Sequence, residues 1–119
     1  ALCRWWGLRR GALAAMALFG AFHLLNVFGG VPLWKALIQT CLAGIAGAIF
    51  VVAALATRSL LVPMVIHGLY DFAVIDAARL AAAGADSTPA LFVPLVSISL
   101  GIWCTLRIWR MAEAPPYGD

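Results

Sequence analysis

The sequence predicts an all-α fold, a polytopic bundle of transmembrane helices that forms a single domain over residues 1–119. Composition carries this prediction, because 65% of the residues are hydrophobic and only 11% are charged. The mean hydropathy is +1.01, whereas a soluble domain is about 45–50% apolar and about 25% charged. This apolar composition leads us to expect membrane lipids as partners. No basic patch is interleaved with aromatic residues, so we expect no nucleic acid.

The apolar runs, each about as long as a membrane span requires, predict about four spans that follow the tail of a truncated helix. A membrane helix needs about 20 mainly apolar residues, and Gly- and Pro-containing breaks separate the runs. The second span is rich in Gly and Ala, which let membrane helices approach closely. The expected helices cover residues 1–9, 12–28, 33–56, 60–83 and 90–110, with breaks at Arg9-Arg10-Gly11, Gly29–Pro32, Thr57–Ser59 and Gly84–Pro89.

Arginine placement predicts the orientation of these spans. The arginines lie at one side of the predicted bundle, and the opposite loops carry only Lys35 and Asp86. Because positive charge accumulates on the cytoplasmic side, we expect the Arg58 turn to be cytoplasmic. The sequence therefore predicts an integral, multi-pass protein, which we place in a bacterial cell membrane. The arginines used are Arg4, Arg9, Arg10, Arg58, Arg107 and Arg110.

Three ionisable residues in apolar runs form the candidate site. His67 and Asp71 lie four residues apart in the segment 60–72, so they share one helix face. His23 lies in another apolar run, and these are the two histidines of the chain. Ionisable groups inside a membrane usually face a bundle interior or a polar cavity. Estimated depths overlap, so we expect His23, His67 and Asp71 to share one cavity.

Such a cavity favours hydrolysis. A neutral histidine can take a proton from water or bind a metal, and a second histidine can donate to a developing oxyanion. A protonated Asp71 could donate as well. No serine or cysteine is placed nearby, so water is the expected nucleophile, although a carboxylate base is missing near the helix of Arg4. Structural interpretations stay open: a core histidine at His23, a hydrogen-bonded His67–Asp71 pair, and an interfacial, snorkelling Arg4.

Three short motifs resemble the CPBP family of intramembrane proteases, which includes the type II CAAX prenyl endopeptidases and bacteriocin-processing or immunity proteins. Phe19–His23 matches the Phe-x-x-x-His motif, and His67–Asp71 matches the His-x-x-x-Asn/Asp motif. Arg4 matches the last residue of the motif formed by two glutamates, three variable residues and arginine. The two glutamates would then stand directly before Ala1. We therefore expect the chain to be an N-terminally truncated fragment of such a protein.

The resemblance implies an intramembrane endopeptidase that hydrolyses a membrane-associated or lipidated peptide. A glutamate before Ala1 and His23 would activate water, and His67 with Asp71 would stabilise the oxyanion or position the substrate. Arg4 would complete the set of site residues. Zinc could be bound through His23 and His67, and the motifs do not decide whether it is needed.

Two other functions remain open at this stage. A non-enzymatic immunity or scaffold protein would keep the same fold without turnover. A bundle that binds haem through His23 and His67 as axial ligands is a further alternative.

Overall fold

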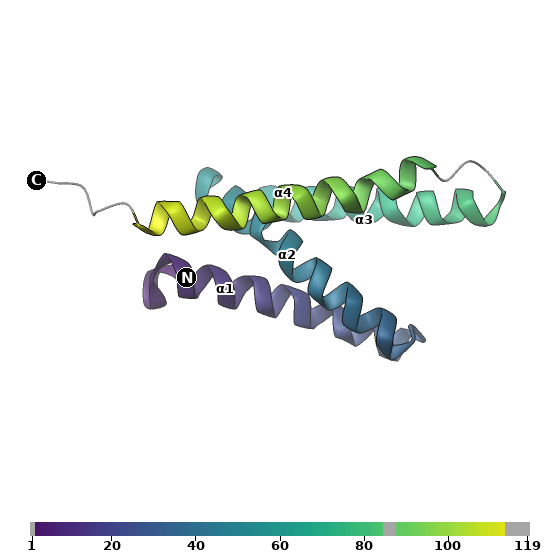
Figure 1. Ribbon diagram of the computed structural model, residues 1–119, viewed down its shortest axis with the longest axis horizontal. Coiled ribbons are helices and arrows are strands. Elements are labelled where there is room, and N and C mark those ends of the chain that lie inside the picture. The colour runs from purple at the N-terminus through teal and green to yellow at the C-terminus, as the bar shows by residue number, and fades with distance from the viewer. Residues whose placement is uncertain (1, 85–87, 114–119) are drawn as a thin grey trace, which may run out of the picture.

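The computed structural model describes residues 2–84 and 88–113 and confirms the all-α class (Figure 1). No strand occurs within these two ranges. The elements are α1 Leu2–His23, the 3₁₀ helix η1 Leu24–Gly29, α2 Leu33–Thr57, α3 Leu61–Ala82 and α4 Thr88–Glu113. Four helical segments are long and apolar enough to cross a membrane: Cys3–Gly29, Leu33–Thr57, Leu61–Ala82 and Phe92–Glu113. The chain is thus an integral membrane protein with four candidate spans.

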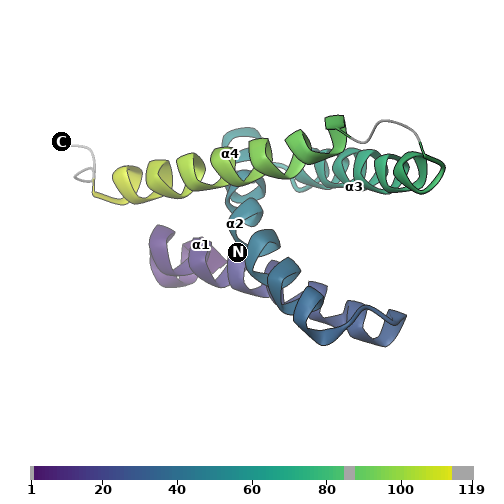
Figure 2. The same ribbon diagram turned by 45° about the vertical axis from the view of Figure 1, so that its right-hand side comes forward.

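Helix α2 is the central element of the bundle. It contacts α1, α3 and α4. Figures 1 and 2 both show α3 and α4 running along one another, with α1 on the other side and α2 crossing between them. Each wall of the bundle is therefore positioned mainly by its contact with α2.

Small residues bring α1 and α4 close to α2. A Cβ atom at Gly20 would lie 2.6 Å from the carbonyl oxygen of Thr40, and one at Gly101 would lie 2.6 Å from that of Ile45. Such distances leave no room for a side chain, so the helices meet at their backbones. The buried core beside these crossings is formed by Ala12, Ala48, Cys104 and Ile108.

The first helix differs from the prediction. The expected break at Arg9-Arg10-Gly11 is wrong, because α1 continues through these residues and Gly11 is buried. The helical course is interrupted at Gly7 instead, where φ is 77° and ψ is 165° (purple end in Figure 1). Only glycine adopts this backbone conformation without steric cost. The segment Leu2–Trp6 therefore does not share the axis of the rest of α1.

The other boundaries lie close to the predicted ones. The expected span 12–28 ends as the 3₁₀ helix η1, which Gly30 terminates at φ 88°. Arg58 ends α2 in the left-handed region at φ 53°, and the Ser59 hydroxyl accepts the Leu61 amide hydrogen at 3.1 Å. The predicted loop 84–89 includes residues 85–87, which lie outside the described residues, and α4 begins at Thr88 and extends to Glu113.

An ion pair joins the two ends of the chain on one face. An Arg9 Nη2 donates to Glu113 Oε1 at 2.7 Å, and the Arg9 guanidinium lies 5.1 Å from the centre of the Trp109 ring. The arginine-rich start of α1 and end of α4 are therefore at the same side of the bundle, as the arginine pattern predicted. The cytoplasmic assignment of that side remains a prediction.

Candidate active site

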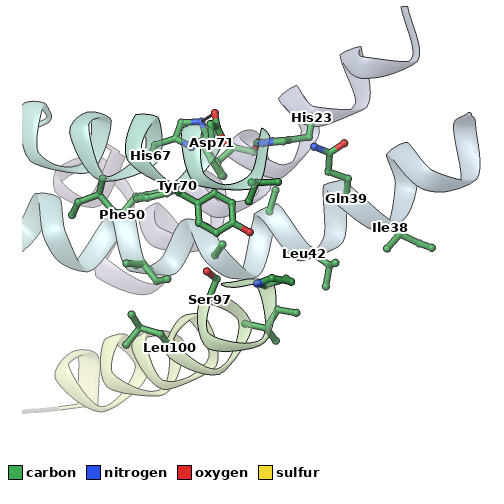
Figure 3. A pocket seen from close by; sticks show the side chains of 18 of the residues that line it. His23, Ile38, Gln39, Leu42, Phe50, His67, Tyr70, Asp71, Ser97 and Leu100 are labelled. Carbon is green, nitrogen blue, oxygen red and sulfur yellow. Dashed lines mark hydrogen bonds and ion pairs between the residues drawn. The ribbon is translucent and has the colours of Figure 1, made fainter. Parts of the chain in front are cut away.

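A cavity of about 500 Å³ lies on α2 between α3 and α4, with the end of α1 at its rim (Figure 3). Its walls are mainly aliphatic and aromatic. Within the described part of the chain, the polar or ionisable side chains that line it are His23, Trp34, Lys35, Gln39, His67, Tyr70, Asp71 and Ser97. The cavity thus combines an apolar lining with a few convergent polar groups, as ligand sites usually do.

His23 is the last residue of α1, and its ring is held in one orientation. Its Nδ1 lies 2.9 Å from the carbonyl oxygen of Phe19 one turn earlier. Because a carbonyl can only accept, this bond places the proton on Nδ1 and leaves Nε2 as an acceptor. The His23 side chain points toward Asp71 and the α3 side of the cavity in Figure 3. A neutral histidine with a free Nε2 can take a proton from a water molecule there.

His67 lies on α3 and is packed between aromatic rings. The centre of its ring is 5.1 Å from that of Phe19 and 5.4 Å from that of Phe50. Its Nε2 is 3.5 Å from Asp71 Oδ2, whereas its Nδ1 is buried without a hydrogen-bond partner. Packing against Phe19 and Phe50 therefore fixes the ring, and the polar edge at Nε2 faces Asp71.

The structure brings together three of the four predicted site residues. The ring centres of His23 and His67 are 6.2 Å apart, and Phe19 contacts both rings. Asp71 lines the same cavity, and half of its side chain is accessible. Arg4 is exposed before the Gly7 interruption and does not line the cavity. The role assigned to Arg4 stays a prediction.

Four further cavity residues were not identified from the sequence. Tyr70 lies three residues after His67, on the same helix face, and its ring projects from α3 toward α4 in Figure 3. Gln39 is held by Asn26, whose side-chain amide donates to it at 3.0 Å. A polar residue inside an apolar span was the available signal for these positions. The four residues are Lys35, Gln39, Tyr70 and Ser97. Ser97 corrects the expectation that no serine lies near the histidines, and its hydroxyl donates to the Val93 carbonyl at 2.9 Å.

The donor set does not complete a zinc site. Catalytic zinc has three protein ligands. No group of three His, Cys, Asp or Glu side chains with metal-binding geometry occurs among residues 2–84 and 88–113. Zinc binding through His23 and His67 would need a third ligand from elsewhere and stays a prediction.

A haem between the two histidines is disfavoured by Phe19. Bis-histidine ligation requires a flat porphyrin between the imidazoles. The Phe19 ring is nearly equidistant from the two, at 4.9 Å from His23 and 5.1 Å from His67, so it lies where that plane would pass. Haem binding would require Phe19 to move. The absence of a Soret band on purification would argue against this alternative.

The fold and the site together define an integral membrane protein with a histidine pair at a cavity inside its helix bundle. Residues 1–73 match the family model for type II CAAX prenyl endopeptidase Rce1-like proteins, and the match covers more than half of the 119 residues. This chain belongs to the Rce1-like family, which confirms the resemblance to the CPBP proteases. Neither a curated protein nor a solved structure matches the chain.

Proposed function

We propose that this protein is an intramembrane endopeptidase that hydrolyses a membrane-associated or lipidated peptide with water as the nucleophile. The observation that carries the proposal is the pairing of His23 and His67, whose ring centres lie 6.2 Å apart at one apolar cavity. The two histidines come from motifs 44 residues apart in a chain of a protease family.

His23 is the water-activating group of the described chain. Its Nδ1–H is engaged by the Phe19 carbonyl, so its Nε2 lone pair is available to accept a proton. General acid–base help of this kind contributes about 10²–10⁴ in rate. We propose that a glutamate directly before Ala1 shares this task, since Arg4 fits the end of the two-glutamate motif.

His67 is the oxyanion-stabilising group. An Nε2–H on this ring can donate to the carbonyl oxygen of the scissile bond as negative charge develops there. Asp71, 3.5 Å away, orients the same edge of the ring. Because Phe19 and Phe50 clamp the ring, little reorganisation is needed when the oxyanion forms.

The cavity suits a short extended peptide segment. Its volume of about 500 Å³ lies within the range of about 300–1,000 Å³ typical of ligand sites. The apolar walls favour binding of substrate side chains that are themselves apolar. These features support an apolar or lipid-modified substrate.

The test is a peptidase assay on the purified chain with Glu-Glu placed before Ala1 in an apolar helical extension. We expect cleavage of a membrane-anchored peptide by the extended chain, none by the chain without the extension, and loss again when the first added glutamate is replaced by glutamine. If the protein with the Glu-Glu extension folds, shows no Soret band and cleaves no peptide, the protease proposal is refuted.

The small number of carboxylates at the cavity favours a second candidate function, that of a non-enzymatic immunity or scaffold protein. Asp71 is the one Asp or Glu among the cavity-lining residues of the described chain. A membrane immunity or scaffold protein of the same fold would need no second carboxylate. Its mark would be an effect on a partner that persists in a His23→Ala variant, with no peptide cleaved.

A further inference from the structure

The C-terminal half of α4 carries another hollow, separate from the candidate active site. Its volume is about 390 Å³, and none of its lining residues lines the cavity that holds the histidines. In both Figure 1 and Figure 2 the end of α4 extends past α3, so α3 does not flank this part of the helix. The residues that line the hollow are Trp103, Leu106, Arg107, Arg110 and Met111.

The hollow lies on a face of α4 that is not packed against α2. Cys104 and Ile108 belong to the buried core on the inner face of the helix. Residues 103, 106, 107 and 110 follow the spacing of a single helix face, which is rotated away from that inner face. Trp103 is 53% exposed and Leu106 is 55% exposed. In a membrane, this outer face of α4 therefore meets lipid.

Two cations at this hollow are not neutralised. Neither Arg107 nor Arg110 takes part in an ion pair within residues 2–84 and 88–113. Glu113, the carboxylate nearest to them in the sequence, is paired with Arg9 instead. A guanidinium group is a planar fork of donors that binds phosphate through two parallel hydrogen bonds. Two such groups one helical turn apart are therefore suited to an anion that bears a phosphate.

The side chains along the hollow follow the order of the parts of a phospholipid. Arg110 lies near the end of the candidate span, which finishes at Glu113. Trp103 lies seven residues deeper, about 10 Å by the helical rise. Between them, the Arg107 guanidinium lies 5.5 Å from the centre of the Trp103 ring, a cation–π contact that orients it. The arginines are thus at headgroup level, and Trp103 with Leu106 is at the level of the acyl chains.

Snorkelling of the arginines is the simpler interpretation, and it predicts a different selectivity. A snorkelling arginine is attracted to any anionic surface, and the attraction grows with the number of basic residues whatever their position. Two guanidinium groups beside one hollow, one of them fixed by Trp103, instead form a local site. A zwitterionic headgroup offers this site a phosphate next to its own ammonium group, whereas an anionic headgroup offers a phosphate without that competing cation.

We propose that Arg107 and Arg110 bind the phosphate of an anionic phospholipid, whose acyl chains pack along Trp103 and Leu106. The lipid belongs to the leaflet on the arginine-rich side, which the charge pattern predicts to be cytoplasmic. This lipid site is separate from the histidine cavity, so it does not depend on the proposed endopeptidase function.

Native mass spectrometry of the purified chain in detergent tests this site. The chain is titrated with dioleoyl phosphatidylglycerol and, separately, with dioleoyl phosphatidylcholine, which has the same acyl chains. We expect the first phosphatidylglycerol to bind about tenfold more tightly, as hydrogen bonds between charged groups allow. The double variant Arg107→Gln with Arg110→Gln should lose this preference.

A charge-matched control removes two other exposed arginines of the same predicted side. Arg10→Gln with Arg58→Gln lowers the net charge by the same amount and leaves the lining of the hollow unchanged. This control should keep the preference for phosphatidylglycerol. Circular dichroism of both double variants checks that their helix content equals that of the unmodified chain.

Three results would overturn the assignment. The first is equal binding of the two lipids by the unmodified chain. The second is an equal loss of preference in the two double variants, which would show that net charge and not this hollow attracts the lipid. The third is displacement of bound phosphatidylglycerol by inorganic phosphate at constant ionic strength, which would identify a site for a small anion.

Discussion

The two sides of α2 are built on different principles. At its crossings with α1 and α4, Gly20 and Gly101 allow backbone contact, and Ala48 and Ile108 are almost fully buried. On the side of α3, Pro63 is the one buried residue of the helix, and the space toward α4 is the cavity. The closely packed part of α2 therefore provides rigidity and the part beside α3 provides room. His23 lies at the packed part, and His67 lies at the open one.

The largest effect is expected from replacing His67, which lies on the cavity side of α2. His67→Ala in the active form of the protein should reduce peptide hydrolysis by about 10²–10³, the usual loss for one oxyanion donor. The thermal unfolding midpoint should fall as well, because the His67 ring packs on Phe19 and Phe50, so the rate is measured per folded molecule. Met64→Ala on the same helix, outside the cavity lining, is the control and should keep its activity. Normal turnover by His67→Ala would contradict the oxyanion role proposed for His67.

A single methyl group at Gly20 should disrupt the close packing of α1 against α2. Gly20→Ala places a Cβ atom 2.6 Å from the Thr40 carbonyl oxygen, so α1 and α2 must separate. Overpacking of this kind costs about 1–3 kcal/mol, which unfolding by a denaturing detergent would measure. Gly68→Ala on α3 is the matched control: a Cβ atom there meets nothing within 4 Å. Equal destabilisation of both variants would contradict the difference in packing.

A smaller effect is expected from Asp71, which also lines the cavity. Asp71→Asn should reduce kcat only a few-fold, because asparagine can still hydrogen-bond His67 and donate to an oxyanion. Rates of peptide cleavage at a fixed pH, with His67→Ala measured in parallel, would check this order. An inactive Asp71→Asn beside an active His67→Ala would reverse the assigned roles.

The smallest effect is expected at the ion pair that ties α1 to α4. Arg9 and Glu113 are 37% and 64% exposed, so their 2.7 Å contact is screened by water and salt. A double-mutant cycle with Arg9→Gln and Glu113→Gln should give a coupling free energy of about 0.2–1 kcal/mol. The coupling should fall at high salt, and a coupling that did not would show that the contact is buried in the membrane-bound protein.

The spans could be predicted from the sequence because apolar length alone determines them. The expected helices 33–56 and 60–83 are found at Leu33–Thr57 and Leu61–Ala82. The break near the N-terminus could not be placed, because Arg9 and Gly11 resemble a boundary, whereas α1 continues through them and Arg9 pairs with Glu113. That contact joins residues 104 positions apart and leaves no local pattern.

The meeting of His23 with His67 could be anticipated, because a polar group inside an apolar run is costly and usually faces a bundle interior. The place of Ser97 in the cavity could not be predicted, although a polar residue in an apolar span marked the position. Membrane helices are apolar on every face, so the sequence does not reveal which face of α4 points inward. The last span held no diagnostic motif, yet Pro94, Ser97 and Leu100 form one wall of the cavity.

The change from α to 3₁₀ winding directly after His23 has a consequence for the register of the site. Each 3₁₀ residue turns the chain about 120° rather than about 100°, so Asn26 is rotated about 60° further than an α-helix would take it. This extra rotation accompanies the Asn26 contact with Gln39. The tighter winding thus adjusts the angle between His23 and Asn26, the residue that contacts α2. One residue inserted between them would turn Asn26 away from α2 and release the end of the helix that carries His23.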